Sequence, residues 1–168
     1  DLHSYVISRF PIVAPPGSDG RYAFVEVEPG RIVAVANIHL PSNRYGPDAV
    51  RDGALPQAVL EIESSRRLPA ARKGIEPLAK FVDDQTPVFI TGDFNAPAHT
   101  DWTTSTAGTR KHLLYPMDWP VSMALEEAGF RDSWRVIHPD PVRNPGLTWW
   151  AARPPLEEYT FGENDGQD

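Results

Sequence analysis

Two polar residues, Asp93 and Asn95, directly follow a short apolar run in the stretch "PVFITGDFNAP", residues 87 to 97. Side chains two positions apart in an extended chain point the same way, so we expect Asp93 and Asn95 to share one side and Phe94 to pack on the other. An aspartate can position or deprotonate a water molecule or bind a hard metal ion, and an asparagine adds an uncharged amide donor. These groups suit the hydrolysis of a phosphate ester, in which charge accumulates on the phosphate oxygens.

A second strand end supports this interpretation. The alternative for the first motif is an Asx turn, since Asp and Asn are common turn formers after a strand. In "VANIHLP", residues 35 to 41, Asn37 and His39 again lie two positions apart at the end of an apolar run. A histidine there can act as acid or base or donate to a phosphate oxygen, although a lone strand-end histidine is more often structural. The two strand ends together predict one phosphate-cleaving site.

The segments around these motifs predict a mixed α/β fold. Tyr22 to Glu28 and Ile32 to Ile38 are expected to form two strands joined by a turn at Pro29-Gly30. The second strand is apolar on both faces, so we expect it to be covered on both sides. "PVFIT" predicts a further strand, and "GLTWW", residues 146 to 150, predicts a last one.

Helical spacing of apolar residues extends from Pro56 to Asp84. Because an interior proline removes a hydrogen bond and clashes with the preceding turn, we expect Pro69 and Pro77 to divide this segment into two or three short helices. The basic stretch from residue 64 to 73 is interpreted as the solvated face of a helix. A further helix is expected over residues 121 to 128, with Pro120 near its start and Gly129 as its C-terminal cap.

Length and composition indicate one globular domain and exclude some chemistry. The chain has 168 residues, 40% of them hydrophobic, and no cysteine, which excludes disulfides and thiolate metal sites. The formal net charge of -7 disfavours non-specific binding to a polyanion, although a divalent cation held by carboxylates can reverse the local field. The sequence shows no signal peptide and no apolar stretch long enough to cross a membrane.

The motifs "VANIHLP", "PVFITGDFNAP" and "GLTWW", in this order, resemble the endonuclease/exonuclease/phosphatase superfamily, which includes deoxyribonuclease I and the neutral sphingomyelinases. The opening "SYVISRFPI" is similar to the strand and turn that precede this part of the family's domain. The resemblance implies a four-layer αββα sandwich. It also implies a phosphoester hydrolase that uses Mg²⁺, or Mn²⁺ or Ca²⁺, and forms no covalent intermediate.

The resemblance further implies roles for three residues. His39 matches the family's phosphate-binding or acid/base histidine. Asp93 matches the aspartate that orients or activates the attacking water and approaches a metal ion. Asn95 matches the asparagine whose amide contacts the scissile phosphate. His39, Asp93 and Asn95 are therefore the expected catalytic residues, and Asp93 and Asn95 are also the candidate metal ligands.

Four residues are weaker candidates for binding substrate. Asn37 shares its strand end with His39, and His99 follows the main motif closely enough to line a cleft. Arg44 and Tyr45 could meet a phosphate and stack on a substrate group. For His99, Arg44 and Tyr45 the alternative is a purely structural loop role.

Several segments of the family pattern are not found in this sequence. These are the asparagine and the metal-binding glutamate of the family's first strands, an R-I-D segment and a terminal S-D-H segment. We therefore expect the chain, residues 1 to 168, to be the central part of a longer enzyme.

The substrate is left open between a nucleic acid, a phospholipid headgroup and a small phosphodiester, and the acidic charge favours the last two. The sequence does not indicate an oligomeric state, and a secreted location is only mildly favoured, by the loop pattern. The alternative to an enzyme is a non-catalytic binding or scaffolding domain that keeps the same sandwich.

Overall fold

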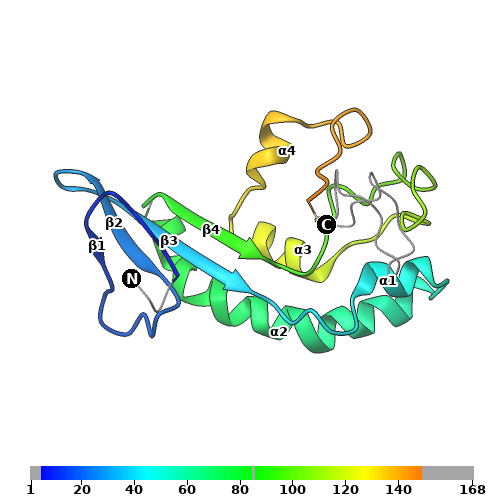
Figure 1. The fold of residues 1–168 in the computed structure, drawn as a ribbon, viewed down its shortest axis with the longest axis horizontal. Coiled ribbons are helices and arrows are strands. Elements are labelled where there is room, and N and C mark those ends of the chain that lie inside the picture. The colour runs from blue at the N-terminus through cyan, green and yellow to red at the C-terminus, as the bar shows by residue number, and fades with distance from the viewer. Residues whose placement is uncertain (1–4, 85, 149–168) are drawn as a thin grey trace.

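The protein has a mixed α/β fold (Figure 1), and the motifs "VANIHLP" and "PVFITGDFNAP" lie at the ends of two of its strands. The structure is a computed structural model that describes residues 5–84 and 86–148. In chain order its elements are β1 (Ile12–Val13), β2 (Ala23–Glu28), β3 (Arg31–His39), α1 (Gly46–Arg51), α2 (Pro56–Asp83), β4 (Val88–Asp93), α3 (Pro120–Glu127) and α4 (Ser133–Ile137). The four strands form one sheet in the order β1-β2-β3-β4.

The pairing of β3 with both of its neighbours determines where the motifs lie. β2 and β3 form the expected antiparallel hairpin, and Gly30 in its turn has a φ of 75°, a conformation that glycine adopts without strain. β4 pairs with β3 in parallel, and α1 and α2 form the connection between them. Because parallel strands end at the same edge of a sheet, "VANIHLP" and "GDFN" meet there.

Helix α2 corrects one expectation, because it continues through both prolines. Pro69 and Pro77 lie inside a single helix from Pro56 to Asp83. Pro69 is exposed, and so is Ser65, whose carbonyl lacks its usual donor from position 69, while Val59, Ala71 and other residues of the helix are buried. Burial of this face stabilises the helix more than the two prolines destabilise it.

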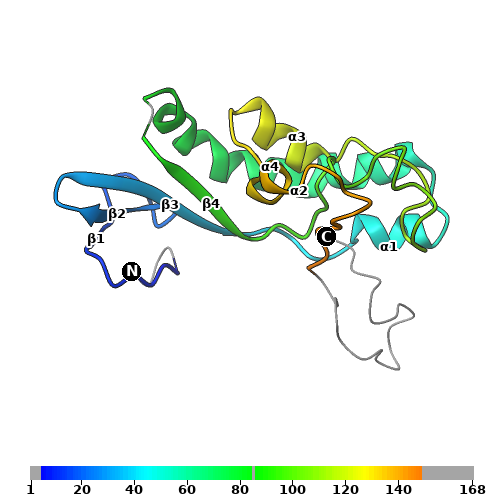
Figure 2. The same cartoon turned by 90° about the horizontal axis from the view of Figure 1, so that it is seen from above.

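The two faces of the sheet differ in how well they are covered. α2 and α3 lie on the same side of the sheet (Figure 2), where Ala34 and Ala36 of β3 are fully buried. On the opposite face, Val33 and Val35 are only half-buried and Phe89 of β4 is 55% exposed. The expectation that both faces of β3 are covered is therefore wrong for the part of the chain that the structure describes.

The remaining helices and strands match the expectations from the sequence only in part. α3 begins at Pro120 and is followed by Gly129 with a φ of 86°, as expected. Residues 146–148 form no strand, and Trp149 and Trp150 lie outside the described residues. In "SYVISRFPI" only Ile12 belongs to a strand among the residues described. The sequence did not predict the short helices α1 and α4.

Two further observations concern the architecture as a whole. The described residues show one four-stranded sheet with a helical layer, which is a mixed α/β architecture and does not extend to four layers. Within residues 5–84 and 86–148, the helices are too short or too polar to cross a lipid bilayer.

Candidate functional site

His39 and Asp93 face each other at the ends of the two parallel strands. They are register partners in the β3–β4 ladder, and His39 Nε2 lies 3.7 Å from Asp93 Oδ2. Their side chains are 74% and 55% exposed, so both are open to solvent. This distance is too long for a direct hydrogen bond but close enough for a shared water molecule or phosphate oxygen to contact both groups.

Gly92 allows the two strands to approach at this edge. Its φ is 132°, and a Cβ atom built there would lie 1.9 Å from the carbonyl oxygen of Ile38. No side chain can occupy that space, so the close contact between β3 and β4 just before His39 and Asp93 requires glycine. The glycine of "GDFN" thus determines the geometry of the pair.

Asn95 reaches the same edge through a turn and not through an extended strand. β4 ends at Asp93, and Asn95 has a φ of 47°, so the extended conformation that we expected at this position is wrong. The backbone N–H of Asn95 donates to Asp93 Oδ1 at 3.0 Å, which is the Asx turn named as the alternative. Asn95 Nδ2 donates to the carbonyl of Leu40 at 3.0 Å, and the Leu40 N–H donates to the carbonyl of Asp93 at 2.9 Å. The turn therefore ties Asn95 to the residue after His39.

Phe94 anchors this turn in the core. It packs against a cluster of buried residues that includes Leu40, Ala71 and Ala96. Of the expected arrangement, the packing of Phe94 into the core is therefore seen, although the extended backbone on which it was based is not. An apolar anchor next to two exposed polar groups restricts the orientation of the turn.

The other predicted residues are dispersed around this edge. Asn37 is half-buried and pairs with Thr91 one step inside the sheet. Arg44 and Tyr45 lie in the loop that enters α1, where Arg44 has a φ of 54° and the Tyr45 ring lies 5.7 Å from the guanidinium of Arg67.

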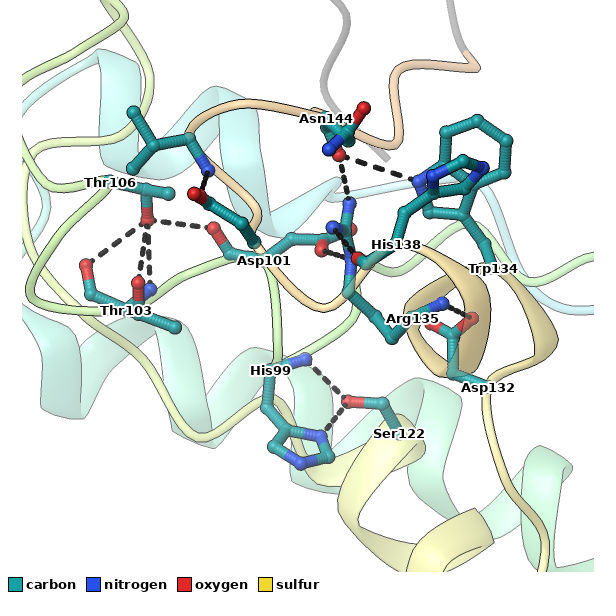
Figure 3. Close-up of polar contacts among 12 residues, drawn as sticks. His99, Asp101, Thr103, Thr106, Ser122, Asp132, Trp134, Arg135, His138 and Asn144 are labelled. Carbon is teal, nitrogen blue, oxygen red and sulfur yellow. Dashed lines mark hydrogen bonds and ion pairs between the residues drawn. The ribbon is translucent and has the colours of Figure 1, made fainter.

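His99 is held by α3. Its Nδ1 lies 2.9 Å from Ser122 Oγ, its backbone N–H donates to the same oxygen at 2.8 Å, and its Nε2 lies 2.8 Å from Glu126 Oε2. Figure 3 shows the imidazole directed at Ser122. These contacts fix the loop after the "GDFN" turn onto α3.

A buried ion pair, which the sequence interpretation missed, supports the loop after His39. Glu63 and Arg67 of α2 are both fully buried, with Arg67 Nη1 2.8 Å from Glu63 Oε1. Arg67 also donates to the backbone carbonyls of residues 42, 43 and 44. Burial raises the pKa of Glu63 to about 7, although the neighbouring Arg67 charge opposes the shift. The interpretation of residues 64–73 as a solvated face is therefore wrong for Arg67.

A groove of about 720 Å³ begins at the Asp93 edge; we call it the Asp93 groove. Its lining consists of residues 92–94, 96 and 98, Asp101, Asp132, Trp134 and residues 145–148. Sequence reasoning missed this groove, because α4 and the residues that follow it come from a segment without a regular apolar period.

A divalent cation can find only part of its ligands in the described site. Within residues 5–84 and 86–148, no three His, Asp or Glu side chains come together in a way that could hold a metal ion. Asp93 and Asn95 nevertheless provide hard oxygen atoms at one exposed edge. Mg²⁺ usually retains several water ligands and binds through one or two carboxylates plus the phosphates of its substrate, so this donor set fits a Mg²⁺ ion bound together with substrate.

Comparison with known proteins adds one relative. No protein-family model matches the chain. The chain is 31% identical over 150 residues to the uncharacterized protein F14F9.5 of Caenorhabditis elegans, a match that covers 83% of the chain. The chain spans 46% of the length of that relative, whose description assigns no activity.

Proposed function

We propose that this chain carries part of the active site of a metal-dependent phosphoesterase of the endonuclease/exonuclease/phosphatase type. The observation that carries the proposal is the placement of His39 and Asp93 as register partners, 3.7 Å apart and open to solvent, at the carboxyl end of two parallel strands. Ligands commonly bind at this edge of an α/β sheet. Asn95, tied to Leu40, adds an amide donor to the same edge.

The three side chains divide the work of an in-line attack on phosphorus. Asp93 Oδ2 orients a water molecule and accepts its proton, while Oδ1 remains bound to the Asn95 N–H. His39 donates a proton from Nε2 to a phosphate oxygen or to the leaving group. Asn95 uses one amide hydrogen for Leu40, and its second amide hydrogen can donate to the phosphate.

Asp93 and Asn95 are the residues of this chain that would hold a Mg²⁺ ion, which supplies positive charge against the phosphate oxygens when bound. Positive charge is needed there because the Asp93 groove, as far as it is described, contains three carboxylates and no lysine or arginine. Mn²⁺ and Ca²⁺ are alternative ions for the same oxygen donors.

The proposed fold is the four-layer sandwich of that superfamily. Val33, Val35 and Phe89 form an incompletely covered apolar strip on the face of the sheet opposite α2. An apolar sheet face of this kind usually packs on another layer. We propose that a second sheet covers this strip in the whole protein.

Hydrolysis of bis-p-nitrophenyl phosphate by the whole protein that contains this chain, in the presence of Mg²⁺, tests the proposal. We expect Asp93→Asn to reduce kcat by about 100-fold or more and Asn95→Ala by about tenfold. Asp19→Asn is the matched control, because Asp19 is exposed and has a φ of 49°, which asparagine also tolerates. Equal rates for the whole wild-type protein and its Asp93→Asn variant would refute the assignment.

The alternative is a binding or scaffolding domain with no catalytic activity. It is favoured by the absence of a three-residue metal cluster from the described part of the chain. Under this alternative no variant changes the hydrolysis rate, while the same substrate still perturbs the NMR signals of His39 and Asp93. The two functions therefore give different results in one set of samples.

A further inference from the structure

We propose that the Asp93 groove binds the non-phosphate part of the substrate, and that this part is an uncharged apolar or aromatic group. The inference rests on the proposed function and deepens it by naming a substrate class, a phosphodiester with a single negative charge. The groove begins at Asp93, so a substrate with its phosphate at the His39–Asp93 edge extends directly into it.

The walls of the groove are mainly apolar. Phe94, Ala96 and Ala98 belong to the lining in and after the "GDFN" turn, and Trp134 and Leu147 add apolar surface from the segment that contains α4 and the residues after it. Apolar surface of this kind gains free energy by leaving water, at about 25 cal/mol per Å² buried. A substrate group without charge therefore gains most from this space.

The charges in the groove disfavour a polyanion. Asp93, Asp101 and Asp132 line it, and no lysine or arginine is among its described residues. The guanidinium of the nearby Arg135 is already engaged within the protein, because Nε contacts Asp101 Oδ1 at 2.5 Å while Nη1 and Nη2 donate to the carbonyls of His138 and Asn144, both at 2.7 Å (Figure 3). A nucleic acid would bring further phosphates to a surface that offers them no cation.

Trp134 is held in place before any ligand arrives. Its Nε1 donates to the carbonyl of Asn144 at 3.4 Å, and its ring lies 4.1 Å from the imidazole of His138, measured between ring centroids. A Cβ atom on Gly146 would lie 3.4 Å from Trp134 Cδ1 and 3.1 Å from Asp101 Oδ2, so this glycine leaves room for both. A fixed aromatic ring that remains 47% exposed is suited to stack on a flat apolar group.

Titration of the chain with two phosphodiesters of equal charge tests the inference. Diphenyl phosphate carries aromatic groups and dimethyl phosphate does not. With Mg²⁺ present, the indole N–H signal of Trp134, identified by its loss in Trp134→Phe, reports binding. We expect diphenyl phosphate to bind at least about tenfold more tightly, because aromatic stacking and apolar burial add to the shared phosphate contact.

Two variants and a polyanion complete the test. Leu147→Ser leaves the contacts of Trp134 intact and should reduce the preference for diphenyl phosphate, whereas Ile137→Ala, at an exposed position on α4 outside the groove, should not. Equal affinities for the two phosphodiesters, an unchanged preference in Leu147→Ser, or tighter binding of a single-stranded oligonucleotide at Trp134 would overturn the inference. Failure of the proposed hydrolysis would be seen separately, in the rate of Asp93→Asn.

Discussion

Two pairs, each of one acidic and one basic side chain, lie near the loop that follows β3. They differ in burial, in the distance between the partners and in their hydrogen bonds. Glu63 and Arg67 are fully buried, 2.8 Å apart, with further hydrogen bonds to the loop backbone. His39 and Asp93 are exposed, 3.7 Å apart. The first pair directs its hydrogen bonds to groups within the protein. The second leaves donors and acceptors available to a ligand.

The difference separates structural from chemical roles. A buried pair is costly to form, but breaking it leaves an uncompensated charge in the core, so its loss affects stability. An exposed pair contributes little to stability, so its residues can be selected for what they do to a substrate. The following experiments test whether the Glu63–Arg67 pair supports stability and the His39–Asp93 pair contributes little to it.

The largest effect on stability is expected from Arg67→Met. It removes the charge that compensates Glu63 and the donors to residues 42–44, and we expect a loss of about 3–5 kcal/mol in the free energy of unfolding. Urea denaturation of this variant and of Arg72→Met, an exposed position on the same helix, measures the effect. A similar, small loss in both variants would show that the buried pair does not support the fold.

The buried carboxyl of Glu63 should make the free energy of unfolding depend on pH. Its pKa in the folded chain is raised from 4.5 to about 7. At a pH between these two values, Glu63 is therefore still protonated in the folded state but has lost its proton in the unfolded state. Its contribution to the free energy of unfolding should therefore fall by about 3 kcal/mol as the pH rises from 4.5 to 7. Glu63→Gln should remove this slope. Parallel profiles for the wild-type chain and Glu63→Gln would contradict the assignment.

Gly92→Ala tests the backbone that brings His39 and Asp93 together. A Cβ atom there would collide with the Ile38 carbonyl at a φ of 132°, and we expect a loss of about 2–3 kcal/mol. Gly30→Ala, with a similarly positive φ but nothing within 4 Å of the added atom, should cost about 1 kcal/mol. Thermal unfolding of both variants separates the collision from the backbone conformation, and equal losses would show that no close approach exists.

The smallest effect is expected from Asp93→Asn. Because Asp93 is exposed and weakly paired, the free energy of unfolding of this variant should differ from that of the wild type by less than about 0.5 kcal/mol. Urea denaturation of the variant used for hydrolysis provides this value. A loss comparable to that of Arg67→Met would mean that the His39–Asp93 pair is structural as well.

The sequence predicted those features that depend on short-range pattern. Alternating and apolar runs located β2, β3 and β4, and Pro120 with Gly129 located α3, since these signals act within a few residues. The meeting of His39 and Asp93 also follows from the pattern, because parallel strands end at one edge.

The remaining features depend on contacts between distant residues. Arg67 lies in a basic stretch whose composition suggests solvent, yet Glu63 four residues earlier and the loop carbonyls beside it allow its burial. Continuation of α2 through Pro69 likewise depends on which helix face is buried. The Asp93 groove combines β4, its turn and the segment after α4, and no local pattern indicates that they meet.

The central claim is that His39 and Asp93 act as one catalytic unit, and a double-mutant cycle in kcat for bis-p-nitrophenyl phosphate tests it most directly. We expect the His39→Ala, Asp93→Asn double variant to be about as slow as the slower single variant, because removing either partner disables the shared step. In the whole protein, rates equal to the wild type in all three variants, or two losses that simply multiply, would contradict the account.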